Sequence, residues 1–387
     1  MPQKLHRGKK RVFRKQRTAV LKNIVLGILG VMVVAGSFFA TKYIVEHPRT
    51  TAESSSVPSS DASSPSSEQP SSSEPSVSEP EQPAAATHGF YLPVETLRDE
   101  AQLDTLLTQA TAAGFNHVVF DLKPVSGELQ YVSAVTLAAR NTAKDAWTME
   151  QLTALARRLR DKGLEPVPRL FAFQDESAGD LDSAKITYGD STITWLDAKP
   201  ENGGKPWLNP CSPDARAYIL GLVEELKNNG FQTVMLDGVQ FPNKEWGAFY
   251  GHDPLSSQPK RTVLETFLQE VRAVEGVTVI LSMPGEAAAN GAEAFGGNPL
   301  TLGAAVAAPA LTAEAASYET VKAQVTAAQA LLQTQEGAVL EPWLTTAGYT
   351  AAQVQEQLRA VRESGGDTAG YWLYHAQGVY DFAALQS

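Results

Sequence analysis

The chain has 387 residues, 43% of them apolar and 19% charged, with a formal net charge of −11 and a single cysteine. This length is sufficient for one large domain or two medium domains with hydrophobic cores. The lone Cys211 excludes an internal disulfide framework and every zinc or iron–sulfur site that needs several cysteines. Residues 89–387 carry 21 Lys/Arg and 36 Asp/Glu, a net charge of −15. Such an acidic domain is not expected to bind nucleic acid, because that affinity depends on neutralising phosphates.

The first 45 residues have the pattern of a membrane anchor. Residues 1–22 are basic, and residues 23–45 begin with nineteen uncharged, mostly apolar residues. A helix of that length spans roughly 28 Å, close to the hydrocarbon thickness of a bilayer. The positive charges before it place the N-terminus in the cytoplasm. We therefore predict a single-pass protein of the cell membrane with an extracellular C-terminal domain. A cleaved signal peptide is the alternative, because Ala35-Gly36-Ser37 resembles a cleavage site.

Residues 46–88 are rich in Ser, Pro and Glu. Such a segment cannot bury enough apolar surface to offset the entropy lost on ordering it. It is predicted to be a disordered linker that holds the C-terminal domain on the order of 35 Å from the membrane.

Residues 89–387 alternate between short apolar runs and longer amphipathic stretches. Continuous apolar runs are typical of parallel strands that are covered on both faces. The expected strands are 90–93, 117–122, 166–171, 233–237, 277–282, 304–308, 338–340 and 371–374. The expected helices are 96–113, 149–162, 214–229, 262–274, 313–333 and 351–363, each followed closely by a glycine. This order predicts an α/β fold of the (β/α)₈ TIM-barrel type. An open doubly wound sheet is the alternative, but the Gly-rich first turn typical of that fold is absent.

Two of the apolar runs end alike, one in Asp121 and one in Asp237. In a barrel the active site lies at the carboxyl ends of the strands, so both carboxylates are candidates for catalysis. Two facing carboxylates are the minimum that glycoside hydrolysis requires. The alternative is that each Asp caps the turn after its strand.

Four more charged residues are candidates near the same strand ends: Lys123, Arg169, Glu286 and Glu341. Arg169 lies in an apolar strand and needs a partner, because an unpaired buried charge is costly. A salt bridge from Arg169 to a strand-end carboxylate would satisfy it. Glu286 is a candidate proton donor, although Gly285-Glu286-Ala287 also reads as an ordinary helix start.

Several aromatic residues are predicted in the loops and strand ends, among them Trp246, Trp343 and Tyr374. Flat aromatic faces can stack on sugar rings, although core packing is the alternative for each of them. Trp246 lies in a polar loop and is expected to be exposed. The histidines lack metal-ligand spacing, so neither a metal nor a cofactor is expected.

The region from about Gly89 to the C-terminus resembles the Putative glycosyl hydrolase domain family, TIM barrels of bacterial envelopes distantly similar to α-amylase-type glycosidases. The resemblance rests on Gly89-Phe90-Tyr91, on the runs 116–123 and 206–210, on Leu236-Asp237-Gly238-Val239-Gln240-Phe241-Pro242, and on Pro342-Trp343-Leu344. It implies that Asp237 occupies the position of the amylase-type nucleophile. It also implies that Gln240 and Glu341 stand where the family has Arg, and that Ser282 stands where the family has Asp.

These observations predict a membrane-anchored glycoside hydrolase acting on a polysaccharide or oligosaccharide of the cell envelope or extracellular space. Asp237 is the expected nucleophile or general base, and Asp121 or Glu286 the expected acid. Lys123, Arg169, Gln240, Trp246, Glu341, Trp343 and Tyr374 are the expected substrate-binding residues. The alternative is a degenerate barrel that binds a glycan or an envelope protein without hydrolysis.

Overall fold

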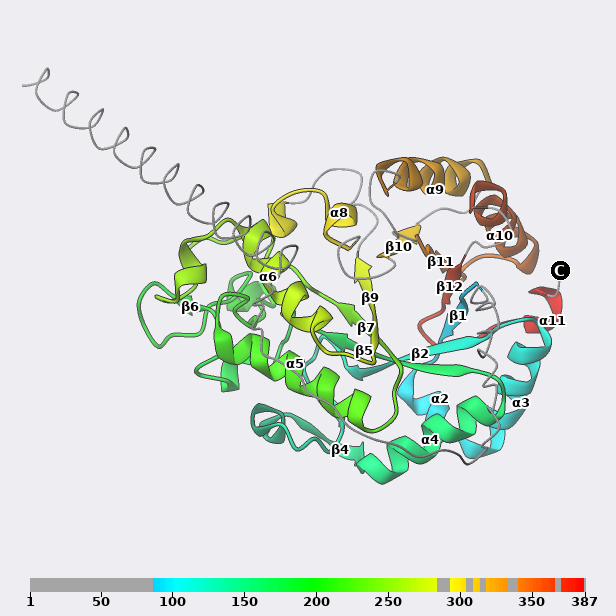
Figure 1. The fold of residues 1–387 in the computed structure, drawn as a ribbon, viewed down its shortest axis with the longest axis horizontal. Coiled ribbons are helices and arrows are strands. Elements are labelled where there is room, and N and C mark those ends of the chain that lie inside the picture. Colours follow the sequence, from blue (N-terminus) through cyan, green and yellow to red (C-terminus); the bar gives the residue numbers. More distant parts are fainter. Residues whose placement is uncertain are drawn as a thin grey trace, which may run out of the picture. The chain divides into compact units, whose positions relative to one another are not determined.

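The structure is a computed structural model. It describes residues 86–283, 293–303, 309–313, 318–332, 340–365 and 370–385. Within these segments eight strands form a barrel (Figure 1). They are β1 (His88–Tyr91), β2 (His117–Lys123), β5 (Glu165–Phe171), β7 (Thr233–Asp237), β9 (Thr278–Met283), β10 (Pro309–Ala313), β11 (Trp343–Thr345) and β12 (Tyr371–Tyr374).

The barrel strands are parallel and close in the order β1-β12-β11-β10-β9-β7-β5-β2. Helices follow the strands along the chain and surround them in Figure 1. The helices are α2 (Val94–Arg98), α3 (Glu100–Ala112), α4 (Met149–Asp161), α5 (Pro213–Asn228), α6 (Lys260–Arg272), α8 (Pro299–Gly303), α9 (Tyr318–Leu332), α10 (Ala351–Gly365) and α11 (Phe382–Leu385). This arrangement is that of a parallel α/β barrel.

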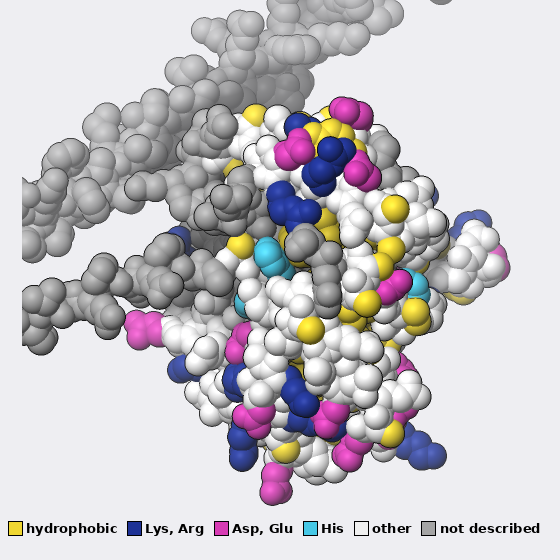
Figure 2. All heavy atoms as spheres, turned by 90° about the vertical axis from the view of Figure 1, so that its right-hand side faces the viewer, with side chains coloured by type: hydrophobic (Ala, Val, Ile, Leu, Met, Phe, Trp, Pro, Cys, Tyr) yellow, Lys and Arg dark blue, Asp and Glu magenta, His cyan; other side chains and the backbone are white. Residues whose placement is uncertain are grey.

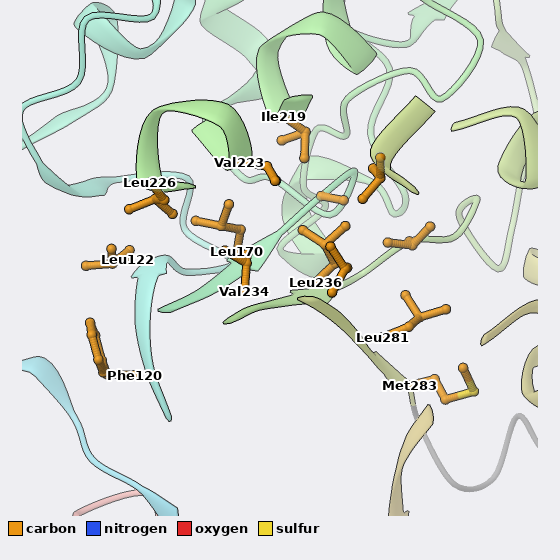
Figure 3. Close-up of a cluster of buried hydrophobic side chains, with 14 of the residues drawn as sticks. Phe120, Leu122, Leu170, Ile219, Val223, Leu226, Val234, Leu236, Leu281 and Met283 are labelled. Atoms are coloured by element: carbon orange, nitrogen blue, oxygen red, sulfur yellow. The ribbon is translucent and has the colours of Figure 1, made fainter. Parts of the chain in front are cut away.

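Strand alternation separates the two cores of the barrel. On β2, Phe120 and Leu122 face outward and pack in the cluster between sheet and helices, together with α5 residues such as Ile219 and Leu226 (Figure 3). Val119 faces inward with Met235 and other residues of a separate interior cluster. Because successive strand residues point to opposite faces, polar residues in the inward series come together inside the barrel.

Two small sheets lie outside the barrel. The loop after β2 contains β3 (Leu129–Tyr131) and β4 (Thr142–Trp147), which pair in parallel. The loops after β5 and β7 contribute β6 (Thr187–Tyr188) and β8 (Ala248–Phe249), which pair antiparallel. Short 3₁₀ helices cover Thr136–Arg140, Ala178–Asp180, Pro200–Asn202, Pro254–Ser257 and Glu293–Phe295.

The strand bounds differ from those predicted in the sixth and seventh units. β10 begins at Pro309, after the predicted run 304–308, which lies outside the described residues. β11 begins at Trp343, after the predicted run 338–340. The predicted helix 96–113 is divided at Asp99, whose side chain accepts a hydrogen bond from Gln102 N and caps α3.

The predicted basic segment 1–22, the anchor 23–45 and most of the linker 46–88 lie outside the described residues. Among the residues that are described, no helix is long and apolar enough to cross a bilayer. On the face of the molecule drawn in Figure 2, basic and acidic side chains are interspersed and do not gather into an area of one sign.

Candidate active site

The carboxyl ends of three neighbouring strands bring together Asp121, Arg169 and Asp237. Asp121 on β2 is paired in register with Arg169 on β5, and Phe171 at the end of β5 is paired with Asp237 at the end of β7. The side chains of all three charged residues remain slightly accessible, with exposed fractions of 16%, 10% and 17% respectively. Two carboxylates and one guanidinium therefore share one end of the barrel.

Arg169 binds Asp121 through two hydrogen bonds. Its Nε donates to Oδ1 at 2.5 Å, and its Nη2 donates to Oδ2 at 3.1 Å. The hydroxyl of Tyr91, at the end of β1, donates to the same Oδ2 at 3.0 Å. Both oxygens of Asp121 thus act as acceptors, in the two-pronged geometry that makes Arg–carboxylate pairs strong. Asp121 is therefore the charged partner that Arg169 needs within its apolar strand.

Aromatic rings surround the Arg169 guanidinium. Its centre lies 5.2 Å from the ring centres of both Tyr91 and Phe171, and 5.7 Å from that of Trp343. Burial by itself would lower the pKa of Arg169, but the charge and hydrogen bonds of Asp121, and the charge of Asp237, raise it overall. Arg169 is therefore a fixed positive charge between the two carboxylates.

Asp237 is held by two hydrogen bonds and one longer ionic contact. Its Oδ1 accepts a hydrogen bond of 2.7 Å from Gly238 N, and its Oδ2 accepts one of 2.8 Å from the Ser282 hydroxyl. Arg169 Nη1 lies 3.7 Å from the same Oδ2. Gly238 has a φ of 61°, in the left-handed region that glycine enters without strain. The turn after β7 therefore bends back so that its first N–H orients the carboxylate.

Ser282 is a site residue that the sequence analysis named only as a departure from the family pattern. It lies on β9, two residues after the inward-facing Ile280, so it belongs to the inward series of that strand. This alternation was the available signal, since a buried hydroxyl inside a barrel needs a partner. Its partner is Asp237 on the adjacent strand.

Trp343 and Tyr374 complete the same end of the barrel interior. The Tyr374 ring lies 5.1 Å from that of Tyr91 and 6.0 Å from that of Trp343. Trp343 also packs against Trp372, with ring centres 5.6 Å apart. The buried Nε1 of Trp343 has no hydrogen-bond partner within the described part of the chain. We call Tyr91, Asp121, Arg169, Asp237, Ser282, Trp343 and Tyr374 the carboxyl-end cluster.

Lys123 does not reach this cluster, contrary to its predicted position. A register shift between Asp121 and Lys123 pairs Lys123 with Leu170, which faces the outer core. The side chain is completely buried: its Nζ lies 2.7 Å from Asp175 Oδ2 and donates to the backbone oxygen of Phe171 at 2.7 Å. A side chain without accessible surface cannot contact a substrate, so the prediction of substrate binding is corrected to a structural ion pair.

Glu341 is likewise displaced from its predicted position. It precedes β11 and so lies at the amino end of the barrel, whereas the cluster lies at the carboxyl end. Its Oε2 accepts a hydrogen bond of 2.8 Å from Trp372 Nε1, and burial raises the pKa of its carboxyl group. The prediction placed a strand over 338–340 with Glu341 at its end; the strand instead starts after Pro342, which has no N–H for sheet pairing.

Two of the remaining predicted residues, Gln240 and Trp246, lie in the loop after β7. Gln240 is buried in the turn after β7, and Trp246 is 54% exposed further along the same loop, as expected. Glu286 lies outside the described residues. No group of three His, Cys, Asp or Glu side chains in the described segments is placed to hold a metal ion.

Comparison with known proteins identifies a family for most of the barrel. Residues 89–287 match the family described as Putative glycosyl hydrolase domain. None of the curated proteins matches the sequence.

Solved structures of similar fold include two glycoside hydrolases. The PgaB (BpsB) glycoside hydrolase domain from Bordetella bronchiseptica matches with 15% identity over 78% of this chain and 98% of that domain, at a TM-score of 0.57. The alpha-L-fucosidase isoenzyme 2 from Paenibacillus thiaminolyticus matches with 12% identity over 78% of this chain and 48% of that enzyme, at a TM-score of 0.52. At these identities the likeness concerns the fold alone.

Proposed function

The chain belongs to the Putative glycosyl hydrolase domain family, and on this premise we propose that it hydrolyses glycosidic bonds in a polysaccharide or oligosaccharide of the cell envelope or extracellular space. The observation that carries this proposal is the oriented Asp237 carboxylate. It sits at the end of a barrel strand, it is partly accessible, and it has a fixed rotamer because Gly238 N and Ser282 bind its two oxygens. A catalytic carboxylate needs this combination of orientation and access.

Asp237 is the proposed nucleophile or general base. In either role its anionic form is the reactive one. The positive charge that develops on the sugar ring in the transition state lies beside the carboxylates of Asp237 and Asp121. Arg169 offsets one of these two negative charges, so the three residues together contribute a net negative charge where the oxocarbenium-like ring forms.

The proton donor is the second part of the proposal. Asp121 uses both oxygens as acceptors from Arg169 and Tyr91, so a proton carried by it would displace one of these bonds. This favours Glu286 as the acid, with Asp121 positioning Arg169. Variants that replace each carboxyl group by its amide separate the two assignments.

We also propose that residues 23–45 anchor the protein in the cell membrane and that residues 46–88 hold the barrel outside it. The support is the asymmetry of the basic residues, which are frequent before the apolar run and nearly absent from the residues that follow it. Protease added to intact cells would then remove the barrel and leave the N-terminal segment protected.

Release of reducing ends from cell-wall glycan strands and capsule polysaccharide by the full-length protein tests the hydrolase proposal. Asp237→Asn is expected to reduce the rate about 10²- to 10⁴-fold, and Glu286→Gln by a similar factor. Asp182→Asn, at an exposed loop position, serves as the control and leaves the rate unchanged. Equal release by wild type and Asp237→Asn would refute the assignment.

A glycan-binding barrel without hydrolysis is the second candidate. It is favoured by the bidentate pairing of Asp121, which leaves Asp237 without a second free carboxylate among the described residues of the cluster. In that case no reducing ends are released, while Asp237→Asn still binds the polysaccharide.

A further inference from the structure

We propose that the β6–β8 sheet carries a second sugar-binding position, formed by Trp246 and Tyr188, which holds a polysaccharide chain at a distance from the bond that is cut. The inference rests on the proposed function, because the occupant is the same chain that reaches Asp237. The inference also narrows the substrate class. The substrate would be an extended polymer that is recognised over several sugar units, and not a single sugar unit at the end of a chain.

The indole of Trp246 is an exposed aromatic surface. The side chain is 54% exposed, whereas the other five tryptophans are buried or half-buried. Its ring packs against that of Tyr188 on β6, with centres 5.5 Å apart and an angle of 51° between the planes. Exposed tryptophans that pack on one side leave the rest of the ring available to a ligand, and apolar faces of pyranose rings suit such a surface.

The loop that carries Trp246 is held by two hydrogen bonds, one at Trp246 itself and one at Gly247. Trp195 Nε1 donates a hydrogen bond of 2.9 Å to the Trp246 carbonyl, and Gly189 N donates one of 3.1 Å to the Gly247 carbonyl. Gly247 has a φ of 71°, and a Cβ there would lie 3.1 Å from the Tyr188 ring. The position thus requires glycine, and the ring pair is ordered before a ligand arrives, which lowers the entropic cost of binding.

A buried aromatic layer supports this surface. Ile186, Trp195 and Trp207 form a hydrophobic cluster of their own, against which Tyr188 and Ala248 pack. The sheet therefore has a core separate from that of the barrel. A ring that binds a ligand needs a rigid support beneath it, which this cluster provides. A ring that only fills space in the core would be buried by other side chains.

The chain segments that follow β6 and β8 carry polar side chains, which sugar hydroxyl groups require. Asp190 and His252 pair at 3.1 Å and are both largely exposed. Ser191 lies in the turn after Tyr188, and its hydroxyl group donates a hydrogen bond to the Tyr188 carbonyl. The chain segments that follow β6 and β8 thus carry a carboxylate, an imidazole and a hydroxyl group, which favours a carbohydrate over an apolar protein surface as the ligand.

Chain connectivity places this surface on the loops of the candidate active site. β6 lies in the loop that leaves β5 after Arg169, and β8 in the loop that leaves β7 after Asp237. Both loops start at the carboxyl end of the barrel, where substrates of such barrels bind. A polymer bound at Asp237 and continuing over these loops would meet Trp246.

Affinity electrophoresis tests this position. Full-length Asp237→Asn, which does not consume the polymer, is run in native gels containing hydroxyethylcellulose, glycol chitin or purified cell-wall glycan strands. At least one polymer is expected to retard it. Adding Trp246→Ala should raise the dissociation constant for the polymer about tenfold, which corresponds to a loss of about 1.4 kcal/mol of binding free energy. Val379→Ala, at another exposed apolar residue, is the matched control and should leave retardation unchanged.

Acrylamide quenching of tryptophan fluorescence gives an independent measurement, because Trp246 is the exposed tryptophan. Bound oligosaccharide should reduce the quenching in wild type and leave it unchanged in Trp246→Ala. In the active protein, Trp246→Ala should slow release from polymer about tenfold and leave release from a trisaccharide unaffected.

Retardation that is equal with and without Trp246, or absent with every polymer, overturns the inference. Trp246-dependent sedimentation with phosphatidylglycerol vesicles and no retardation by polymer would assign the surface to a membrane instead. Neither result depends on the hydrolysis test, since a protein that binds polymer through Trp246 without releasing reducing ends refutes only the proposed reaction.

Discussion

Ser282 on β9 donates a hydrogen bond of 2.8 Å to Asp237 on β7, so two neighbouring strands together fix the orientation of the candidate catalytic carboxylate. Gly238 N supplies the other bond, from within the turn that follows Asp237 itself. One donor is thus local and the other comes from 45 residues further along the chain. The long-range donor can be removed without altering the turn.

Replacing Ser282 by Ala removes this donor and leaves the turn after β7 intact. We expect kcat to fall about tenfold with little change in KM, because a misoriented Asp237 affects the transition state more than the bound substrate. Steady-state kinetics on a soluble oligosaccharide measures both constants. Thr266→Ala removes a hydroxyl that bonds within α6 and should change neither. A change in KM alone would mean that Ser282 contacts the sugar.

Replacing Ser282 by Asp restores the residue expected from the family pattern. The new carboxylate would lie beside Asp237, and the two would share a proton, because like charges at that separation cannot both ionise readily. A new acidic limb in the pH–rate profile is therefore expected. An unchanged profile would show that the side chain at position 282 does not interact with the titrating group.

Arg169 and Asp121 should be strongly coupled in stability. Arg169→Met leaves a largely buried carboxylate without its main partner and is expected to cost about 3–5 kcal/mol of unfolding free energy. Asp121→Asn added to Arg169→Met should recover part of that loss, with a coupling energy above about 1 kcal/mol. Denaturant unfolding of wild type, the two single variants and the double variant gives this coupling energy. The exposed Arg359–Glu356 pair on α10 is the control cycle and should show no measurable coupling.

Lys123 and Asp175 should behave as a structural pair that fastens the loop after β5. Both side chains have no exposed surface. Lys123→Met leaves Asp175 buried and unpaired, so a loss of about 3–5 kcal/mol is expected, and Lys123→Met with Asp175→Leu should be more stable than the single variant. Chemical denaturation measures both. If Lys123→Met unfolds like wild type, the ion pair with Asp175 does not contribute to stability.

Glu341 predicts a pH-dependent change in stability. Burial raises its pKa above the ordinary value of 4.5, against the smaller opposing effects of hydrogen bonds from Thr87 and Trp372. The folded state therefore binds the proton more tightly than the unfolded chain, and stability falls as the pH rises above 4.5. Glu341→Gln removes this ionisation, so the variant should exceed wild type in stability at pH 7, and the excess should vanish at pH 4.

Unfolding curves at pH 4 and pH 7, followed by tryptophan fluorescence, measure this difference. Glu356→Gln, at an exposed position on α10, provides the comparison and should not alter the pH dependence. Glu341→Gln could instead be less stable than wild type at both pH 4 and pH 7. That result would show that the hydrogen bond from Trp372 outweighs the cost of burying the charge.

Strand positions were predictable where the apolar run is long and its flanks are clear. β7 and β12 have the predicted bounds, and α4 and α5 begin where Thr148 and Ser212 cap them. β10 and β11 begin several residues after the predicted strands, because the Ala-rich runs before them have weak patterning.

The amino-acid sequence alone determined that Asp121 and Asp237 lie near the carboxyl ends of two strands and that Arg169 needs a partner within an apolar strand. Both conclusions rest on local properties, namely the pattern of apolar residues and the cost of a buried charge. Only the tertiary structure decided that Arg169 pairs with Asp121, that Ser282 binds Asp237, and that the shift after Asp121 turns Lys123 into the outer core. These depend on the register between strands far apart in the chain, and register follows from how the whole barrel closes.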